Sequence, residues 1–130
     1  MLATNQMVGM DFAFPDLCKT PPALIPIPYP DMAYPMAAIP IAVNVLFNSA
    51  FSHNLATQIP VTIGDLPGVA MGLISQTVAA SSRRLFMNSY TTLIYGTPAN
   101  RMCAGGPQNT INTVGYTVVP SVPHIVILAA

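Results

Sequence analysis

A run of prolines near the amino end limits what this chain can fold into more than any other feature. Eight of the 14 prolines lie between residues 15 and 40. Within this run Pro26, Pro28 and Pro30 alternate with apolar or aromatic residues, which excludes a helix because proline lacks the amide hydrogen and clashes with the preceding turn. We therefore predict an extended strand at a sheet edge, or an arm that wraps the fold. The alternative is a flexible polyproline linker.

Composition sets the size of the fold and the nature of its surface. With 130 residues, of which 52% are hydrophobic, the chain can form one domain with its own core, so we expect a single domain over residues 1–130. Only 6% of the residues are charged, and the net charge is zero. An ordinary soluble domain carries about a quarter charged residues. A surface with so few charges tends to adhere to other molecules. We therefore expect a partner protein to cover part of it.

The same composition argues against several classes of function. Nucleic-acid binding needs clustered basic residues, and the only basic pair here is Arg83–Arg84. Residues 102–130 contain no charged side chain, but their prolines and glycines argue against a membrane-spanning helix. The amino end does not resemble a secretory signal. We expect synthesis in the cytoplasm and, if the protein is exported, a route other than the general pathway.

Short strand signals follow the proline run. Strands are expected at residues 41–47, 54–63, 84–87, 90–95, 116–119 and 124–128. The segments 84–87 and 90–95 are expected to pair as a hairpin around Asn88–Ser89, and residues 64–68 (Gly-Asp-Leu-Pro-Gly) form a turn signal. Residues 69–80 are ambiguous between helix and strand. Many short strands joined by proline and glycine turns indicate an all-β barrel, sandwich or prism.

A second hairpin motif spans residues 89–101. Its turn is Gly96–Thr97, and its returning arm opens with Pro98–Ala99–Asn100–Arg101. This segment resembles the family named for its Pro-Ala-Ala-Arg (PAAR) motif, in which a strand, a glycine turn and the motif follow one another. The third motif position departs from the family pattern, because Asn100 stands in place of alanine.

Further segments resemble the PAAR-like branch that is found with type VI secretion. Residues 14–21 and 27–31 are similar to its amino-terminal signature, with Asp31 where asparagine is usual. Residues 64–68 and 72–75 also match its pattern. The resemblance runs in order from about Phe14 to the carboxyl end.

The resemblance implies a compact, cone-shaped β-prism with a pseudo-three-fold arrangement, in which residues 1–13 form an amino-terminal extension. Such a protein sits as a monomer on the blunt end of a trimeric valine-glycine-repeat spike, sharpens it, and travels with it from the bacterial cytoplasm into a target cell or the medium. Because the chain ends just after its last expected strand, a toxin effector would have to bind separately. The alternative is a small metal-binding or adhesive β-domain that recognises another partner.

Members of the related family hold a metal ion at the apex through histidines and a cysteine. This chain has two of each, Cys18, His53, Cys103 and His124, which is a complete tetrahedral set for zinc. We predict a site that uses at least three of them, with Cys103 and His124 preferred, then Cys18, then His53. The alternative is that the cysteines and histidines are only packed in the fold.

Catalysis is not expected. A nucleophile needs an adjacent base, and paired carboxylates are needed for glycoside hydrolysis; the four aspartates do not suggest a pair. Asp65 is expected to cap its own glycine-rich turn, and Arg83 and Arg84 to be solvated. A hydrolase built on Cys103 with His53 or His124 is a remote third possibility.

Overall fold

The computed structural model describes residues 1–128, and these residues form short antiparallel strands with a single turn of helix. The elements are β1 Leu2–Ala3, β2 Met10–Thr20, β3 Ile25–Ala33, η1 Pro35–Ala37, β4 Leu46–Phe47, β5 Ala50–Phe51, β6 Gln58–Ile59, β7 Thr62–Ile63, β8 Ser82–Arg83, β9 Ser89–Ile94, β10 Thr97–Ala99, β11 Gly105–Gln108, β12 Thr113–Val119 and β13 Val122–Val126. The predicted all-β class is confirmed. No helix in this part of the chain has the length and apolar character needed to cross a membrane.

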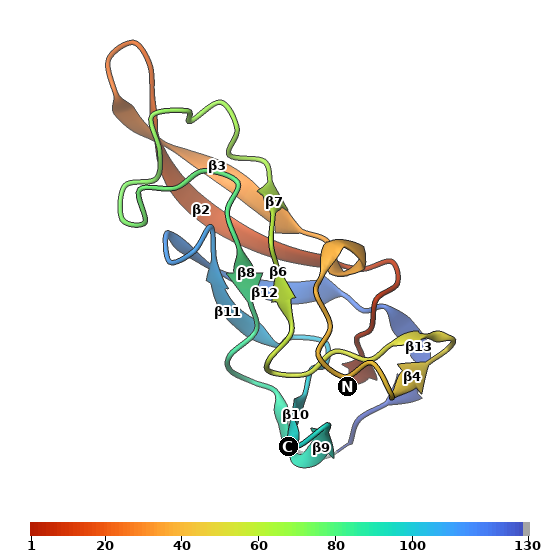
Figure 1. Cartoon of the computed structure of the whole chain (residues 1–130). Helices are drawn as coiled ribbons and strands as arrows, with labels where there is room; N and C mark the ends of the chain where they lie inside the picture. Colours follow the sequence, from red (N-terminus) through yellow and green to blue (C-terminus); the bar gives the residue numbers. More distant parts are fainter. Residues whose placement is uncertain (129–130) are drawn as a thin grey trace.

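The main sheet has five strands in the order β11-β12-β2-β3-β7, and the other strands form four two-stranded sheets, β1-β13, β9-β10, β4-β5 and β6-β8. The long β2–β3 hairpin projects beyond the rest of the molecule, so the body tapers toward the turn between these strands (Figure 1). The opposite, broad end carries β4, β9, β10 and β13.

The proline run forms most of this projecting hairpin. Strand β3 pairs with β2 along its length, but with β7 only at Met32 and Ala33. Residues 25–29 therefore have a neighbour on one side, and Pro26 and Pro28 place their missing amide donors where no ladder requires them. The prediction of an edge strand is confirmed for this part of the run.

The two faces of the main sheet are inverted relative to an ordinary soluble protein. One row across the sheet, Thr117–Asp11–Ala33–Thr62, faces inward and is buried. The next row, Tyr116–Phe12–Met32–Ile63, has the opposite orientation, because side chains alternate along a strand. Tyr116 and Ile63 at its two ends are exposed. The polar row thus faces the interior and the apolar row faces outward.

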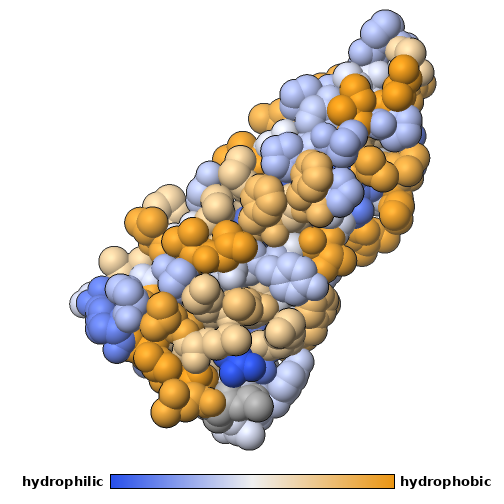
Figure 2. All heavy atoms as spheres, turned by 180° about the vertical axis from the view of Figure 1, so that it is seen from behind, coloured by the Kyte–Doolittle hydropathy of each residue, from blue (hydrophilic) through white to orange (hydrophobic). Residues whose placement is uncertain are grey.

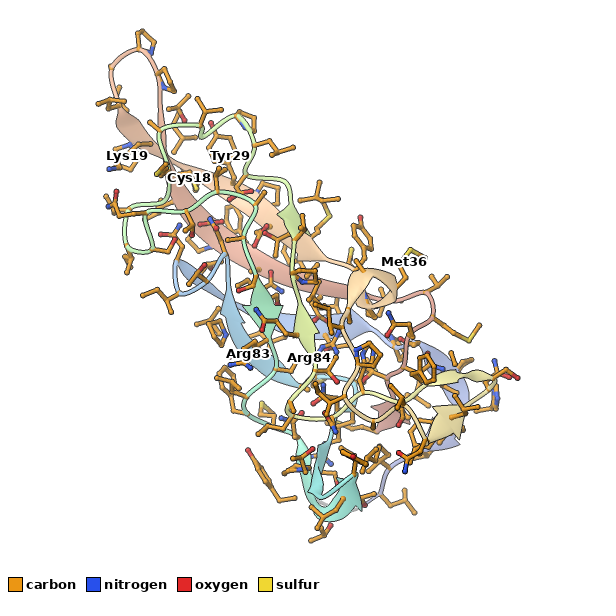
Figure 3. All side chains as sticks on the ribbon, in the orientation of Figure 1. Cys18, Lys19, Tyr29, Met36, Arg83 and Arg84 are labelled. Carbon is orange, nitrogen blue, oxygen red and sulfur yellow. The ribbon has the colours of Figure 1, made fainter. Side chains whose placement is uncertain are left out.

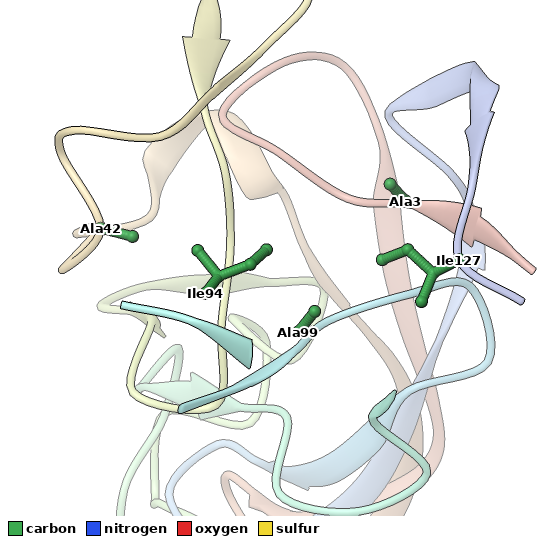
Figure 4. Packing of buried hydrophobic residues seen from close by; sticks show 5 residues of the cluster. All are labelled: Ala3, Ala42, Ile94, Ala99 and Ile127. Atoms are coloured by element: carbon green, nitrogen blue, oxygen red, sulfur yellow. The ribbon is translucent and has the colours of Figure 1, made fainter. Parts of the chain in front are cut away.

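Buried side chains elsewhere follow the same rule. Among residues 1–128, 21 polar or charged residues are buried against 12 hydrophobic ones, of which seven are alanine. One small apolar cluster lies at the broad end and joins Ala3, Ala42, Ile94, Ala99 and Ile127 (Figure 4). Large apolar side chains are instead widespread on the surface (Figure 2). The interior is therefore mainly polar, and buried hydrogen bonds connect its segments.

Two of the expected strands are wrong. Residues 41–47 are irregular except for β4, and Ile41 and Val43 are exposed, because apolar residues of this protein do not mark the interior. The predicted hairpin around Asn88–Ser89 does not form. The Asn88 side chain donates to the Arg84 carbonyl and closes a turn there, while β8 pairs with β6.

The motif hairpin and both ends of the chain are closely tied into the fold. Strands β9 and β10 pair around Tyr95–Gly96, one residue before the predicted turn Gly96–Thr97, because Thr97 already pairs with Ile94. Tyr95 and Gly96 both have positive φ, as a tight two-residue turn requires. Within residues 1–13, which we expected as an extension, β1 pairs with β13, and β2 begins at Met10. Strand β12, Thr113–Val119, contains the predicted strand 116–119, whereas β13, Val122–Val126, begins and ends two residues before the predicted strand 124–128.

Candidate functional site

The interior of the narrow half contains a group of two carboxyls and a thiol, formed by Asp16, Cys18 and Asp65. Their ligand atoms all lie within 4.8 Å of one another, and all three residues have 0% exposure. The Cys18 Sγ lies 3.7 Å from Asp16 Oδ1 and 3.7 Å from Asp65 Oδ2. Figure 3 marks Cys18 on β2, below the projecting turn. This Asp-Cys-Asp group could hold a metal ion.

Strand geometry brings the three residues together. Asp16 and Cys18 are two positions apart on β2, so both side chains point to the inner face. Asp65 follows β7, which pairs with the far end of β3. Gly64 makes the link, because its φ of 134° is accessible to glycine and a Cβ there would clash with the Pro30 carbonyl oxygen.

Two asparagines at the β11–β12 turn hold the carboxylates in place. Asn109 Nδ2 donates to Asp16 Oδ2 at 3.0 Å and to Asp65 Oδ2 at 2.7 Å, and Asn112 Nδ2 donates to Asp16 Oδ1. Backbone amides donate to the oxygen of each asparagine, from Ala80 to Asn109 and from Ile74 to Asn112. These bonds determine which way each side-chain amide points.

The Asp65 side chain does not cap its own turn, contrary to the expectation. Both of its carboxyl oxygens accept from the Ala79 amide, at 3.1 and 3.0 Å, and only the backbone carbonyl of Asp65 closes the turn, to the Gly68 amide. The carboxyl thus ties the irregular loop of residues 64–81 to the sheet, because its partners come from separate segments.

Burial governs protonation in the group. It raises the pKa of the Asp16 carboxyl above its ordinary value, against the amides of Asn112 and Asn109, and the charge of Asp65 acts in the same direction as burial. Burial, followed by the charges of Asp16 and Asp65, raises the pKa of the Cys18 thiol to about 12. In the absence of a cation the thiol is therefore protonated and donates to a carboxylate oxygen.

A third buried carboxyl lies beside the group. Asp31 on β3 is two residues from Tyr29, which pairs with Asp16, so the register places Asp31 on the same face as Asp16. Both of its carboxyl oxygens are buried without a hydrogen-bond partner. The pKa of Asp31 is raised to about 7, chiefly by burial. The Thr62 hydroxyl and the Met32 amide lower this pKa in part, and the charges of Asp65 and Asp16 raise it further.

A separate polar chain crosses the centre of the molecule. Arg84 Nε donates to Asp11 Oδ2 at 2.7 Å, and Arg84 Nη1 lies 3.1 Å from His53 Nδ1. Because arginine only donates, His53 Nδ1 is the acceptor and His53 Nε2 donates to Gln6 Oε1 at 3.2 Å. Arg84, which we expected to be solvated, is thus buried in an ion pair.

The structure places the four predicted zinc ligands apart. His53 uses both ring nitrogens in the central chain, His124 is exposed on β13, and Cys103 is half-buried in the turn before β11. Only Cys18 belongs to the metal-competent group found among residues 1–128. Asp16 and Asp65 were not expected there; the spacing Asp-x-Cys on one strand face was the available signal.

These features define a class of small all-β domains with a polar interior, a buried acid–thiol group and an apolar exterior. Residues 9–115 match the family model of the toxin PAAR-like domain, and this range includes every residue of the buried group. The chain therefore belongs to the toxin PAAR-like domain family, as its motifs predicted. Searches of curated proteins and of solved structures gave no match. Membership of this family suggests a protein associated with a type VI secretion spike or related to a toxin.

Proposed function

We propose that the protein is a structural tip that caps the trimeric valine-glycine-repeat spike of a type VI secretion apparatus. In this role it acts without chemistry: it is assembled on the spike in the bacterial cytoplasm and exported with it. A toxin effector that binds separately would be carried along. The observation that supports this most is the combination of PAAR-like family membership with a surface whose large side chains are mainly apolar.

The broad end is the proposed docking surface. The motif hairpin β9–β10 lies there (Figure 1), and it exposes Tyr90, Leu93 and Tyr95 by 56%, 60% and 62%. Aromatic and aliphatic side chains of this size form the buried centre of protein interfaces. The tapered β2–β3 hairpin would then point away from the spike, with its prolines limiting the conformations of its turn.

Zinc is part of the proposal, as a structural ion that stiffens the narrow half. Cys18 is the member of the predicted ligand set that supports it, since its thiol lies in the Asp-Cys-Asp group.

Co-purification with the trimeric spike tests the docking. The expected complex contains one tip for three spike chains, measured by light scattering after size-exclusion chromatography. Leu93→Asp should abolish it, because an unpaired carboxylate would be buried at the interface. The matched control is Val118→Asp, an equally apolar position exposed on the side of the main sheet.

Two outcomes would contradict the proposal. A wild-type protein that stays monomeric beside a folded spike trimer would favour the alternative, a small metal-binding or adhesive domain with another partner. A complex that survives Leu93→Asp but is lost in Val118→Asp would move the docking surface from the broad end to the sheet face.

A further inference from the structure

The side chain of Gln108 on β11 is buried in the interior without a hydrogen bond. It is 1% exposed, and neither its amide nitrogen Nε2 nor its carbonyl oxygen Oε1 has a partner among the described residues 1–128. A glutamine side chain can donate two hydrogen bonds and accept two. Because an unbonded buried amide is costly, each such group in a folded protein has a specific reason, and ordered water is one of them.

Small residues beside Gln108 let its amide reach across the inner face of the main sheet. A Cβ at Gly115 on β12 would lie 2.4 Å from Gln108 Nε2 and 3.0 Å from the Cβ of Ala13 on β2. The amide therefore lies over Gly115 and next to Ala13. On the following strand, β3, Asp31 pairs with Ala13. The row thus leads from the Gln108 amide, over the methyl group of Ala13, to the Asp31 carboxyl.

A hydroxyl group without a partner lies on the other side of the Gln108 amide. Ser82 on β8 is buried, and its Oγ has no hydrogen bond among residues 1–128. Strand β8 touches β11 on both sides of Ser82. The carbonyl of the preceding residue accepts from the Thr110 amide at 2.9 Å, and the carbonyl oxygen of the following residue would lie 2.0 Å from a Cβ at Gly106. Ser82 is therefore placed beside Gln108.

Asp31 and Thr62 complete the set on β3 and β7. Both carboxyl oxygens of Asp31 and the hydroxyl of Thr62 are buried without a hydrogen bond within residues 1–128. Thr62 pairs with Ala33, two residues from Asp31, so the two side chains share the inner face. A carboxylate only accepts, whereas an amide and a hydroxyl also donate. Water satisfies both kinds of group, and a cation would satisfy only the acceptors.

We propose that ordered water molecules bind in the interior between Gln108 and Asp31 and bridge these two side chains, with Ser82 and Thr62 as further partners. A buried water typically makes about three hydrogen bonds to protein groups that are otherwise unbonded, and these four side chains can supply them. The described residues 1–128 form no pocket, which limits the ligand to single water molecules of about 30 Å³ each. The water would connect β8 and β11 with β3. This inference goes beyond the proposed function and depends neither on docking to a spike nor on zinc.

A crystal structure of the full-length protein, at a resolution that shows ordered water, is the first test. At least one water molecule is expected within about 3 Å of a Gln108 side-chain atom, with a second hydrogen bond to Asp31 or Ser82. Direct hydrogen bonds from Gln108 to Asp31 or Ser82, with no water between them, would overturn the proposal. Because this test uses the wild-type chain, it holds even if a variant fails to fold.

Water relaxation in solution gives the second test. Magnetic relaxation dispersion of oxygen-17 water counts the molecules that stay inside the protein for longer than its tumbling time. Gln108→Leu, which has a similar volume but no amide, should hold at least one such molecule fewer than the wild type. Gln76→Leu is the matched control, since Gln76 is exposed, and it should leave the count unchanged. A folded Gln108→Leu protein with the wild-type count, or an equal loss in both variants, would contradict the assignment to Gln108.

Discussion

Arg84 and Asp11, 73 positions apart in the chain, form an ion pair in which both side chains are almost completely buried, at 3% and 2% exposure. The pair joins the segment after β8 to the inner face of β2. On its other side Arg84 meets His53, and Asp11 accepts from the Thr117 hydroxyl at 2.8 Å. These hydrogen bonds therefore connect four segments that lie far apart in the sequence.

Replacing Arg84 should be far more costly than replacing its neighbour. Arg84→Leu leaves the Asp11 carboxylate buried without its cation, which typically lowers the free energy of unfolding by roughly 3–5 kcal/mol. Arg83→Leu is the matched control, because Arg83 is exposed, and it should change the value by less than about 0.5 kcal/mol. Urea titration measures both. Equal effects would show that the buried pair has no special role.

His53 should stay neutral in acid. Burial, followed by the charge of Arg84, lowers its pKa to about 3, so its ring should not gain a proton between pH 7 and pH 4. Nitrogen chemical shifts of the ring, measured by NMR, should show a proton on Nε2 and none on Nδ1 over this range. Protonation of Nδ1 at pH 5 would contradict the hydrogen-bond directions assigned to Arg84 and Gln6.

Asp31 should make the metal-free protein less stable as the pH rises. Its pKa is about 7 in the folded chain and near 3.8 in the unfolded chain, so the folded state binds more protons between these values. The free energy of unfolding should therefore fall between about pH 4 and pH 7. Asp31→Asn should reduce this fall, in urea titrations with a chelator present. A wild-type slope retained in the variant would assign the effect to other groups.

Gly64 should tolerate no side chain. Left-handed backbone alone costs an ordinary residue about 1–2 kcal/mol, and at Gly64 a Cβ would also clash with the Pro30 carbonyl oxygen. Gly96→Ala is the matched control, since Gly96 also has positive φ but its Cβ would meet open space. Thermal unfolding should show a clearly larger loss for Gly64→Ala. Similar melting temperatures would mean that β3 and the loop can separate at little cost.

The sequence predicted those parts of the fold that depend on local backbone chemistry. Proline alternation identified the edge character of residues 25–29, and Gly96 identified the turn of the motif hairpin. Strand β11 was missed because Gly105 and Gly106 carry no strand signal. A Cβ at Gly106 would clash with the Arg83 carbonyl, so this glycine permits a close approach that a single sequence does not reveal. The apolar run at residues 41–47 wrongly predicted a buried strand, because Ile41 and Val43 are exposed on the surface.

The candidate site was predictable only in part. Cys18 was named as a ligand, but its partners Asp65 and Asn109 lie 47 and 91 positions away. Their meeting depends on the pairing of β7 with β3 and on the β11–β12 turn, which are long-range features of the fold. Asp31 was noted as a departure from the family pattern, without any indication that it would be buried beside Asp16.

The inverted main sheet divides two tasks between two sets of residues. The inward row that contains Asp11 and Thr117 makes hydrogen bonds that specify the fold, whereas the side chains of Tyr116 and Ile63 face outward and lie outside this network. Association and folding can therefore change independently during evolution: the outer side chains can be exchanged to suit a different partner while the interior network stays intact.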